Sequence, residues 1–310
     1  MKKATLLGIV VLVVVLASGA ALYGRLRNGR TTLPSEYYQS QPPTAEASTF
    51  DRIVIIVEEN KPRGEVVGNS SAPYINKLAT TYAQATHYNA VTNPSLPNYI
   101  ALTSGTTAGI TNDCNPPGPT CRANVLNIAD RLEQAHKTWK MYAESMPGSC
   151  YSSNKGDYAV KHNPFMYYPD ITGHADRCTS HVVPFSQFTP DLNSAASLPD
   201  YVLISPNLCN DMHNCSVQTG DSWLARNVPQ ILNSAAFTQQ HSLLVITWDE
   251  GDNSDNNVPT IFAGPAAKSG YVSDRYYSHY SLLHTIENNW HLEPLTQNDS
   301  SAPLMTDMLQ

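Results

Sequence analysis

The chain has 310 residues, of which 41% are hydrophobic and 15% are charged, a composition that supplies a sizeable core and excludes disorder over most of the length. Its formal net charge is -7, from 19 basic and 26 acidic residues, and no basic run follows the first thirty residues, which argues against a nucleic-acid partner. The acidic balance does not exclude an anionic substrate, because a bound metal can supply local positive charge.

The first thirty residues predict a signal peptide or a membrane anchor. An apolar run covers residues 6–22 and is flanked by basic residues, namely Lys2, Lys3, Arg25, Arg27 and Arg30. The run is longer than most signal-peptide cores and barely long enough to span a bilayer. Either interpretation exports the rest of the chain, secreted or anchored by this segment to the outer face of the membrane. Residues 31–50 are polar and Pro-containing and predict a linker, so a folded domain is expected over 51–310.

The cysteines support export. Six cysteines fall into three local pairs, Cys114 with Cys121, Cys150 with Cys178, and Cys209 with Cys215. Such short loops can close as disulfides in an oxidising compartment. About fifteen connectivities are open to six cysteines, so the local pairing is a hypothesis.

The first half of the domain predicts strands that alternate with helices. Residues 53–57 form a continuous β-branched run, which is typical of a strand buried on both faces. A helix is expected over 72–85, and a turn-rich segment over 93–98 leads into apolar residues. A second helix is expected over 124–135 and a strand over 138–142.

The second half continues this alternation after a segment over 147–199 that is rich in Pro, Ser, Tyr and Cys and predicts irregular structure held by disulfides. Further strands are expected over 201–204, 243–247 and 259–263, and helices over 222–232 and 280–290. The pattern predicts one α/β domain with a mostly parallel central sheet flanked by helices.

Polar residues follow three of the predicted strands: Glu58, Glu59 and Asn60 follow the strand over 53–57, Asn207, Asp211 and His213 follow the strand over 201–204, and Asp249 and Glu250 follow the strand over 243–247. The carboxyl ends of parallel strands meet at one edge of a sheet. Carboxylates gathered there repel each other unless a cation binds. Each group alone would fit a solvated loop, but the set predicts a metal site.

Ser95 lies in the segment Pro-Ser-Leu-Pro-Asn over 94–98, at the expected start of a helix. The positive field of a helix N-terminus favours both an alkoxide and an incoming anion, so Ser95 is a candidate nucleophile. The alternative is an ordinary helix cap. A capping serine cannot also act as a deprotonated nucleophile, so the two hypotheses exclude each other.

Seven stretches in chain order resemble the phosphoesterase family of the alkaline-phosphatase superfamily, which includes bacterial acid phosphatases and phospholipases C. They are residues 55–60, 69–76, 94–99, 210–213, 220–224, 245–250 and 278–280. The ordered set is far more specific than any one motif, and it looks most like the secreted acid phosphatases of the mycobacterial type. The resemblance implies an alkaline-phosphatase-like α/β sandwich.

The resemblance also implies residue roles. The ligands of a principal metal ion would be Glu59, Asn60, Ser95, Asp249 and Glu250. Ser95 would be the nucleophile, and Asn98 would donate a hydrogen bond to a phosphoryl oxygen. Asp211, His213 and His279 stand where superfamily members hold a second metal or a proton donor, with Asn207 a weaker candidate. The remaining histidines are expected to be surface or structural residues, although His162 lies in a stretch that also resembles relatives at the substrate mouth.

The sequence departs from the family at two positions near the second metal: many relatives have His in place of Asn93 and Asp in place of Asn214. Tyr99 replaces an Arg that sulfatases carry, which disfavours a sulfatase. The implied activity is hydrolysis of phosphate monoesters, such as lipid or nucleotide phosphates, through a phosphoserine. The implied cofactor is a divalent ion, Mg²⁺, Ca²⁺ or Mn²⁺, or Zn²⁺ if the histidines also bind. The alternatives are a phosphodiesterase of the phospholipase C type and a non-catalytic metal-binding relative.

Overall fold

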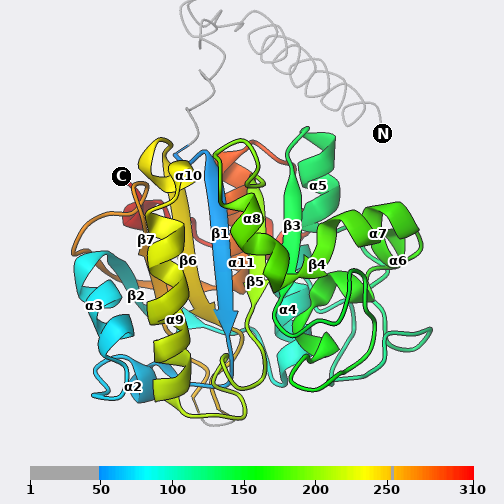
Figure 1. The fold of residues 1–310 in the computed structure, drawn as a ribbon, viewed down its shortest axis with the longest axis horizontal. Coiled ribbons are helices and arrows are strands. Elements are labelled where there is room, and N and C mark those ends of the chain that lie inside the picture. The colour runs from blue at the N-terminus through cyan, green and yellow to red at the C-terminus, as the bar shows by residue number, and fades with distance from the viewer. Residues whose placement is uncertain (1–48, 253–254) are drawn as a thin grey trace, which may run out of the picture. The chain divides into compact units, whose positions relative to one another are not determined.

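The computed structural model describes residues 49–252 and 255–310, which build an eight-stranded sheet with helices on both faces (Figure 1). The strand order is β4-β3-β5-β1-β6-β7-β2-β8. The strands are β1 (Arg52–Glu58), β2 (Ala83–Asn89), β3 (Trp139–Ala143), β4 (Val182–Pro184), β5 (Tyr201–Ser205), β6 (Ser242–Trp248), β7 (Thr260–Ala263) and β8 (Val272–Ser278). β7 runs antiparallel to both of its neighbours, and the other pairs are parallel. The structure confirms the expected α/β fold.

Three buried strands at the centre of the sheet bring the loops that carry the candidate residues together. β1 lies between β5 and β6 and is parallel to both, with Val54 aligned with Val202 on one side and with Leu244 on the other. Almost every residue of these strands is buried, which explains their continuous apolar sequences. Because parallel strands end at the same edge, the loops after β1, β5 and β6 emerge side by side.

Helices α3 and α9 cover one face of the sheet, and α4 and α11 cover the other (Figure 1). The helices are α2 (Arg63–Val66), α3 (Pro73–Thr81), α4 (Ser95–Ser104), α5 (Ile128–Gln134), α6 (Pro169–Thr172), α7 (Ala175–His181), α8 (Phe188–Asp191), α9 (Val217–Leu232), α10 (Ala235–Thr238), α11 (His279–Asn289) and α12 (Gln297–Ser300). The Asp221 carboxylate of α9 accepts hydrogen bonds from the N–H groups of Tyr74 and Ile75 at 3.3 and 2.8 Å. It therefore caps the first turn of α3 and joins the two helices.

The structure corrects several expected elements. The helix expected over 72–85 ends at Thr81, and residues 83–89 form β2 instead. β8 was not expected because its charged residues are exposed, as is typical of an edge strand. The segment 147–199, expected to be irregular, contains short helices and the other edge strand, β4.

The three local disulfides expected from the sequence are confirmed: Cys114–Cys121, Cys150–Cys178 and Cys209–Cys215. They fit an oxidising compartment. The export segment expected over 1–30 and nearly all of the linker expected over 31–50 lie outside the described residues. Within residues 49–252 and 255–310, no helix combines the length and the apolar character needed to cross a bilayer.

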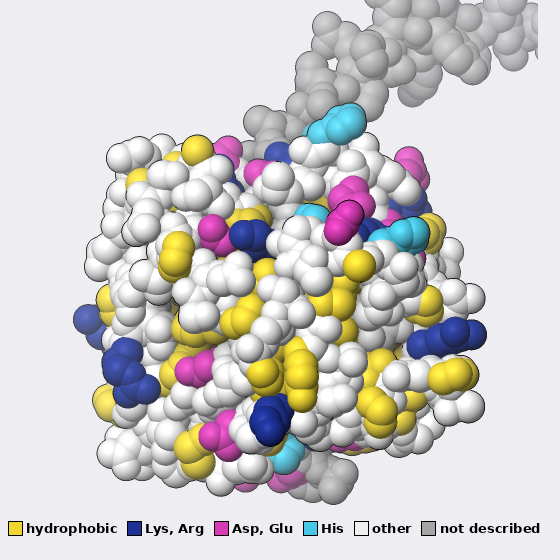
Figure 2. All heavy atoms as spheres, turned by 45° about the vertical axis from the view of Figure 1, so that its right-hand side comes forward, with side chains coloured by type: hydrophobic (Ala, Val, Ile, Leu, Met, Phe, Trp, Pro, Cys, Tyr) yellow, Lys and Arg dark blue, Asp and Glu magenta, His cyan; other side chains and the backbone are white. Residues whose placement is uncertain are grey.

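Charged side chains are dispersed over the face of the domain in Figure 2. Basic and acidic groups alternate there among polar and apolar side chains. At the carboxyl edge of the sheet, by contrast, several acidic groups lie buried inside the protein, namely Glu58, Glu59, Asp249 and Glu250.

Candidate active site

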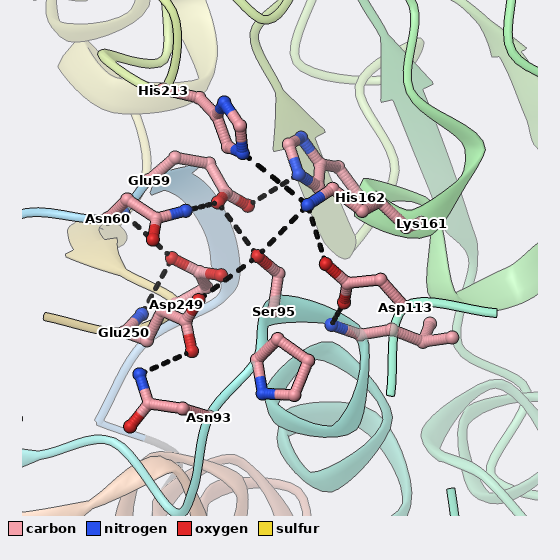
Figure 3. A network of polar contacts seen from close by, with 12 residues as sticks. Glu59, Asn60, Asn93, Ser95, Asp113, Lys161, His162, His213, Asp249 and Glu250 are labelled. Carbon is pink, nitrogen blue, oxygen red and sulfur yellow. Dashed lines mark hydrogen bonds and ion pairs between the residues drawn. The ribbon is translucent and has the colours of Figure 1, made fainter. Parts of the chain in front are cut away.

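Ser95 is the first residue of α4, and Pro94 occupies the N-cap position without a side-chain cap. Ser95 Oγ lies 3.2 Å from Glu59 Oε2 and 3.3 Å from Glu250 Oε1 (Figure 3). The alternative interpretation of Ser95 as an ordinary helix cap is therefore wrong, because its hydroxyl faces carboxylates rather than backbone N–H groups.

A tight turn after β1 joins this region to the end of β6. Asn60 has a φ of 54°, in the left-handed region that Asn tolerates better than most side chains. In this conformation its backbone N–H donates to Asp249 Oδ1 at 3.2 Å, and its Nδ2 donates to Glu59 Oε2 at 2.8 Å. The structure thus brings together the residues expected to form the principal metal site.

Glu59, Asp249 and Glu250, here called the carboxylate cluster, are each at most 3% exposed. Glu59 Oε1 and Asp249 Oδ2 have no hydrogen-bond partner within the described residues. Burial and then the neighbouring Asp249 raise the pKa of Glu59, and burial and then Glu250 raise the pKa of Asp249. Burial is also the main cause that raises the pKa of Glu250 to about 7. Oxygen donors that are crowded, buried and short of partners fit a hard divalent cation.

His162 joins this cluster, although the sequence placed it only near the substrate mouth. It is 2% exposed, with Nε2 3.0 Å from Glu59 Oε1 and Nδ1 3.2 Å from Asp211 Oδ2. The close Nε2 and Oε1 atoms are not aligned as a hydrogen bond. Burial, followed by nearby Lys161, holds the pKa of His162 well below its usual range, so the ring is neutral. Donor atoms of Glu59, His162 and His213 lie within 4.8 Å of one another, which suits a metal ion.

The loop after β5 carries Asp211 and His213. The Asp211 backbone oxygen accepts from Glu59 N–H, and its Oδ1 accepts from His213 N–H, both at 2.8 Å. Burial raises the pKa of Asp211 to about 7. His213 Nδ1 lies 2.8 Å from Asn214 Oδ1, while Nε2 lies 3.4 Å from Lys161 Nζ. Asn214 therefore orients the His213 ring even though it replaces an expected carboxylate.

Asn207, the weaker candidate, shapes this loop. Its Oδ1 accepts from the N–H groups of Cys209 and Asn210 at 3.1 and 3.0 Å. Its own N–H donates to Glu144 Oε2 at 2.9 Å, and the same carboxylate accepts from Asn210 Nδ2. These contacts assign Asn207 to the framework that holds the loop.

Asn98 lies buried on α4, behind the loop that leads into this helix. Its Oδ1 accepts from the N–H groups of Val91 and Thr92, each at 3.0 Å. Its Nδ2 donates to Thr92 O at 2.8 Å and lies 3.4 Å from Glu250 Oε2. In the structure Asn98 thus holds the loop before Ser95 and contacts one carboxylate.

His279 begins α11 and is also fully buried. Its Nε2 donates to the backbone oxygen of Asp249 at 2.6 Å, and its Nδ1 lies 3.1 Å from Tyr88 Oη. Burial lowers the pKa of His279 to about 4. Both ring nitrogens therefore face buried partners, and the ring supports the end of β6.

A cavity of about 440 Å³ opens beside Ser95, lined among others by Asn60, Asp113, Lys161, His213 and Glu250. Asn93 also lines it and donates to Glu250 Oε2 at 2.8 Å. Sequence reasoning missed Asp113 and Lys161, because neither residue follows a predicted strand. The one signal available for Lys161 was its place beside His162 in a stretch that resembles relatives.

Comparison with known proteins shows relatives over most of the chain. The Phosphoesterase family matches residues 67–293. A phosphatidylinositol-3-phosphatase from Mycobacterium tuberculosis is 38% identical over 266 residues, covering 84% of this chain and 83% of that protein. A phosphate-repressible acid phosphatase from Penicillium chrysogenum is 33% identical over 267 residues, covering 83% of this chain and 63% of that enzyme. The chain thus spans less than two thirds of the fungal enzyme.

The fold has solved counterparts as well. A protein in the alkaline phosphatase superfamily from Vibrio parahaemolyticus aligns with a TM-score of 0.59 at 12% identity, covering 85% of this chain and 75% of that one. This similarity shows a shared fold. The chain therefore belongs to the Phosphoesterase family and is a phosphoric ester hydrolase, as the resemblance implied.

Proposed function

We propose that this protein hydrolyses phosphate monoesters by a metal-dependent mechanism in which Ser95 is the nucleophile and becomes a phosphoserine. The observation that carries the proposal is the position of Ser95 Oγ, between Glu59 and Glu250 at the wall of an open cavity. The first turn of α4 adds a positive field that favours both an alkoxide and an incoming phosphate.

The residues that would hold the principal ion are Glu59, Asn60, Ser95, Asp249 and Glu250. A divalent ion there would lower the pKa of the Ser95 hydroxyl and neutralise charge on the phosphoryl group. The oxygen donors favour Mg²⁺, Ca²⁺ or Mn²⁺. His162 and Asp211 offer further donors beside Glu59, and the imidazole nitrogen would suit Zn²⁺.

The reaction follows from these positions. Glu59 and Glu250 orient the Ser95 hydroxyl, whose proton leaves to solvent in the open cavity. Oγ attacks phosphorus in line with the ester oxygen, so the Oγ–P bond forms as the P–O ester bond breaks. The leaving alkoxide takes up a proton, and water then hydrolyses the phosphoserine to release inorganic phosphate and restore the hydroxyl.

We assign the proton transfer to the leaving group to His213. Its Nε2 side faces the cavity, while Nδ1 is held by Asn214. With Nδ1 donating to Asn214, Nε2 is an acceptor in the neutral ring and a donor in the protonated ring. His279 and Asn98 support Asp249 and Glu250 from behind, so we propose that they position these carboxylates.

The relatives support two substrate classes. The mycobacterial relative supports the phosphate of a lipid headgroup, and the fungal relatives support a broader set of monoesters. The disulfides support action outside the cytoplasm. In this proposal residues 1–30 export or anchor the protein, and residues 31–50 link this segment to the catalytic domain over 51–310.

Turnover of p-nitrophenyl phosphate by the purified chain tests the proposal. Ser95→Ala is expected to lower kcat by about 10⁴-fold or more, and chelation is expected to stop turnover until a divalent ion is restored. Ser104→Ala is the matched control, because Ser104 is a buried serine at the other end of α4.

Undiminished turnover by Ser95→Ala would remove the assigned nucleophile. Faster hydrolysis of bis-p-nitrophenyl phosphate than of the monoester would reassign the enzyme as a phosphodiesterase. Metal binding without any turnover would make it a non-catalytic relative.

A further inference from the structure

Lys161 is the one Lys or Arg side chain that lines the cavity beside Ser95 within the described residues. Its Nζ lies 3.5 Å from Ser95 Oγ. In Figure 3, Lys161 and Asp113 lie on one side of Ser95, and the carboxylate cluster lies on the other. A group bound at Oγ would therefore meet a lysine ammonium on the side away from the carboxylates.

Asp113 holds this lysine in place. Lys161 Nζ donates to Asp113 Oδ2 at 2.7 Å, and Asp113 Oδ1 accepts from the Leu96 N–H of α4 at 2.9 Å. The neighbouring Cys114 is bonded to Cys121, which closes the loop that begins at Asp113. The lysine is thus tied to the same helix turn that presents the Ser95 hydroxyl.

The charge at the site favours such a group. The carboxylate cluster and Asp211 supply acidic groups, whereas a phosphate monoester brings about two negative charges near neutral pH. One divalent ion cannot balance both. A lysine ammonium keeps three donors and a full charge on a flexible stem, so it can contact a phosphoryl oxygen and retain Asp113.

We propose that Lys161 binds a nonbridging oxygen of the phosphoryl group, that Asp113 positions Lys161, and that this pair makes the site prefer dianionic monoesters over monoanionic diesters. The inference rests on the proposed function, since it places the phosphoryl group at Ser95 Oγ. Lys161 is a catalytic residue in this scheme, because it contacts the substrate, and Asp113 is a positioning residue.

Lys161→Met in the full-length, metal-loaded protein tests this inference. Lys140→Met is the matched control, because Lys140 also makes a 2.7 Å ion pair, with Asp191, and its side chain is 24% exposed against 18% for Lys161. Calorimetric titration with inorganic phosphate should show a Kd about 10-fold or more higher for Lys161→Met than for Lys140→Met. This readout does not depend on turnover.

Kinetics give the second readout. Lys161→Met is expected to lower kcat/KM for p-nitrophenyl phosphate by about 100-fold, but for the bis-ester by about 10-fold or less, because a monoanion gains less from the lysine charge. Lys161→Arg should recover part of the lost phosphate affinity. Asp113→Asn should weaken phosphate binding in the wild-type protein but add nothing to Lys161→Met, which separates positioning from a general loss of fold.

Equal phosphate affinity and an equal ratio of monoester to diester turnover in Lys161→Met and Lys140→Met would overturn the inference. That result would leave the proposed function intact if Ser95→Ala were inactive. Conversely, loss of phosphate affinity in Lys161→Met would support the lysine contact even if Ser95→Ala kept full turnover, in which case the assigned nucleophile would be wrong.

Discussion

Glu58 and Glu59 are neighbours at the end of β1, and both are 0% exposed, yet their hydrogen-bond surroundings differ. Glu59 lies against Ser95, Asn60 and His162 beside an open cavity. Neither oxygen of Glu58 has a hydrogen-bond partner within the described residues. Successive side chains of a strand point to opposite faces of the sheet, so one residue step separates the two environments.

This difference shows that burial alone does not make a carboxylate part of a site. Burial raises the pKa of both groups, and the carboxylates nearest to Glu58, led by Asp211 and Glu144, raise its pKa further. Glu59 has a histidine and a serine hydroxyl beside it, which would share a cation with it in the proposed site. Glu58 has no such partner within the described residues, and its burial and the nearby carboxylates favour its neutral form.

The same substitution at the two positions gives the largest expected contrast. Glu59→Gln is expected to lower kcat/KM for p-nitrophenyl phosphate by about 10²–10³-fold, because it removes a charged ligand beside Oγ. Glu58→Gln is expected to change kcat/KM by less than about 3-fold and to leave the melting temperature equal or higher, because a neutral group replaces a neutral group. A comparable loss of activity in both variants would break the distinction.

His162 lies against Glu59, so its substitution should also lower activity. His162→Gln is expected to lower kcat/KM by about 10–100-fold, as the loss of a ligand or of its direct support does in metal sites. His181→Gln is the control, because His181 stacks on Trp139 with the same interplanar angle of 15° that His162 makes with Tyr99. Equal kcat/KM values for the two variants would show that His162 has a purely structural role.

Gly220→Ala tests whether a change within α9 affects activity at the site. A Cβ at Gly220 would overlap the Met212 side chain and lie 3.0 Å from the Asn210 backbone oxygen. Met212 lies between Asp211 and His213, so a shift of this loop is expected to lower kcat/KM by about 10-fold. In Gly64→Ala, the control, the added Cβ has nothing within 4 Å. Wild-type kinetics in Gly220→Ala would show that the loop absorbs the clash.

Glu287 is a buried carboxyl on α11, apart from both Glu58 and Glu59, and should affect stability only. Burial and then Asp299 raise its pKa to about 9. The unfolded chain loses this proton near pH 4.3, so between about pH 4 and 9 the folded state binds more protons and stability falls as pH rises. Glu287→Gln should therefore raise the melting temperature by about 2–4 °C at pH 8 and by less at pH 5. A uniform change at both pH values would contradict this assignment.

The central strands were predictable because burial on both faces constrains their sequences. β1, β5 and β6 are buried on both faces and are therefore continuously apolar. β2 was partly assigned to a helix because its Ala-rich start carries no strand pattern, and only its pairing with β7 and β8 fixes it. β8 was missed because an edge strand can expose charged residues.

The site residues that directly follow a strand were predictable from the sequence. Glu59 and Asp249 come directly after β1 and β6, so the topology of a parallel sheet brings them together. Lys161 and His162 lie in a short 3-10 turn inside the loop closed by Cys150–Cys178, and Asp113 lies just before Cys114, so no periodicity relates their distance in sequence to their distance in space. Only the folded chain shows that they lie beside Ser95.

The central claim is that the Glu59 side of β1, and not the Glu58 side, holds a divalent cation next to Ser95. Its most direct test is to strip the protein with a chelator, reload it with a divalent metal and measure the bound metal by elemental mass spectrometry. We predict that wild type and Glu58→Gln retain the same stoichiometric amount of metal and that Glu59→Gln loses it. Equal metal content in all three proteins, or loss from Glu58→Gln alone, would contradict the claim.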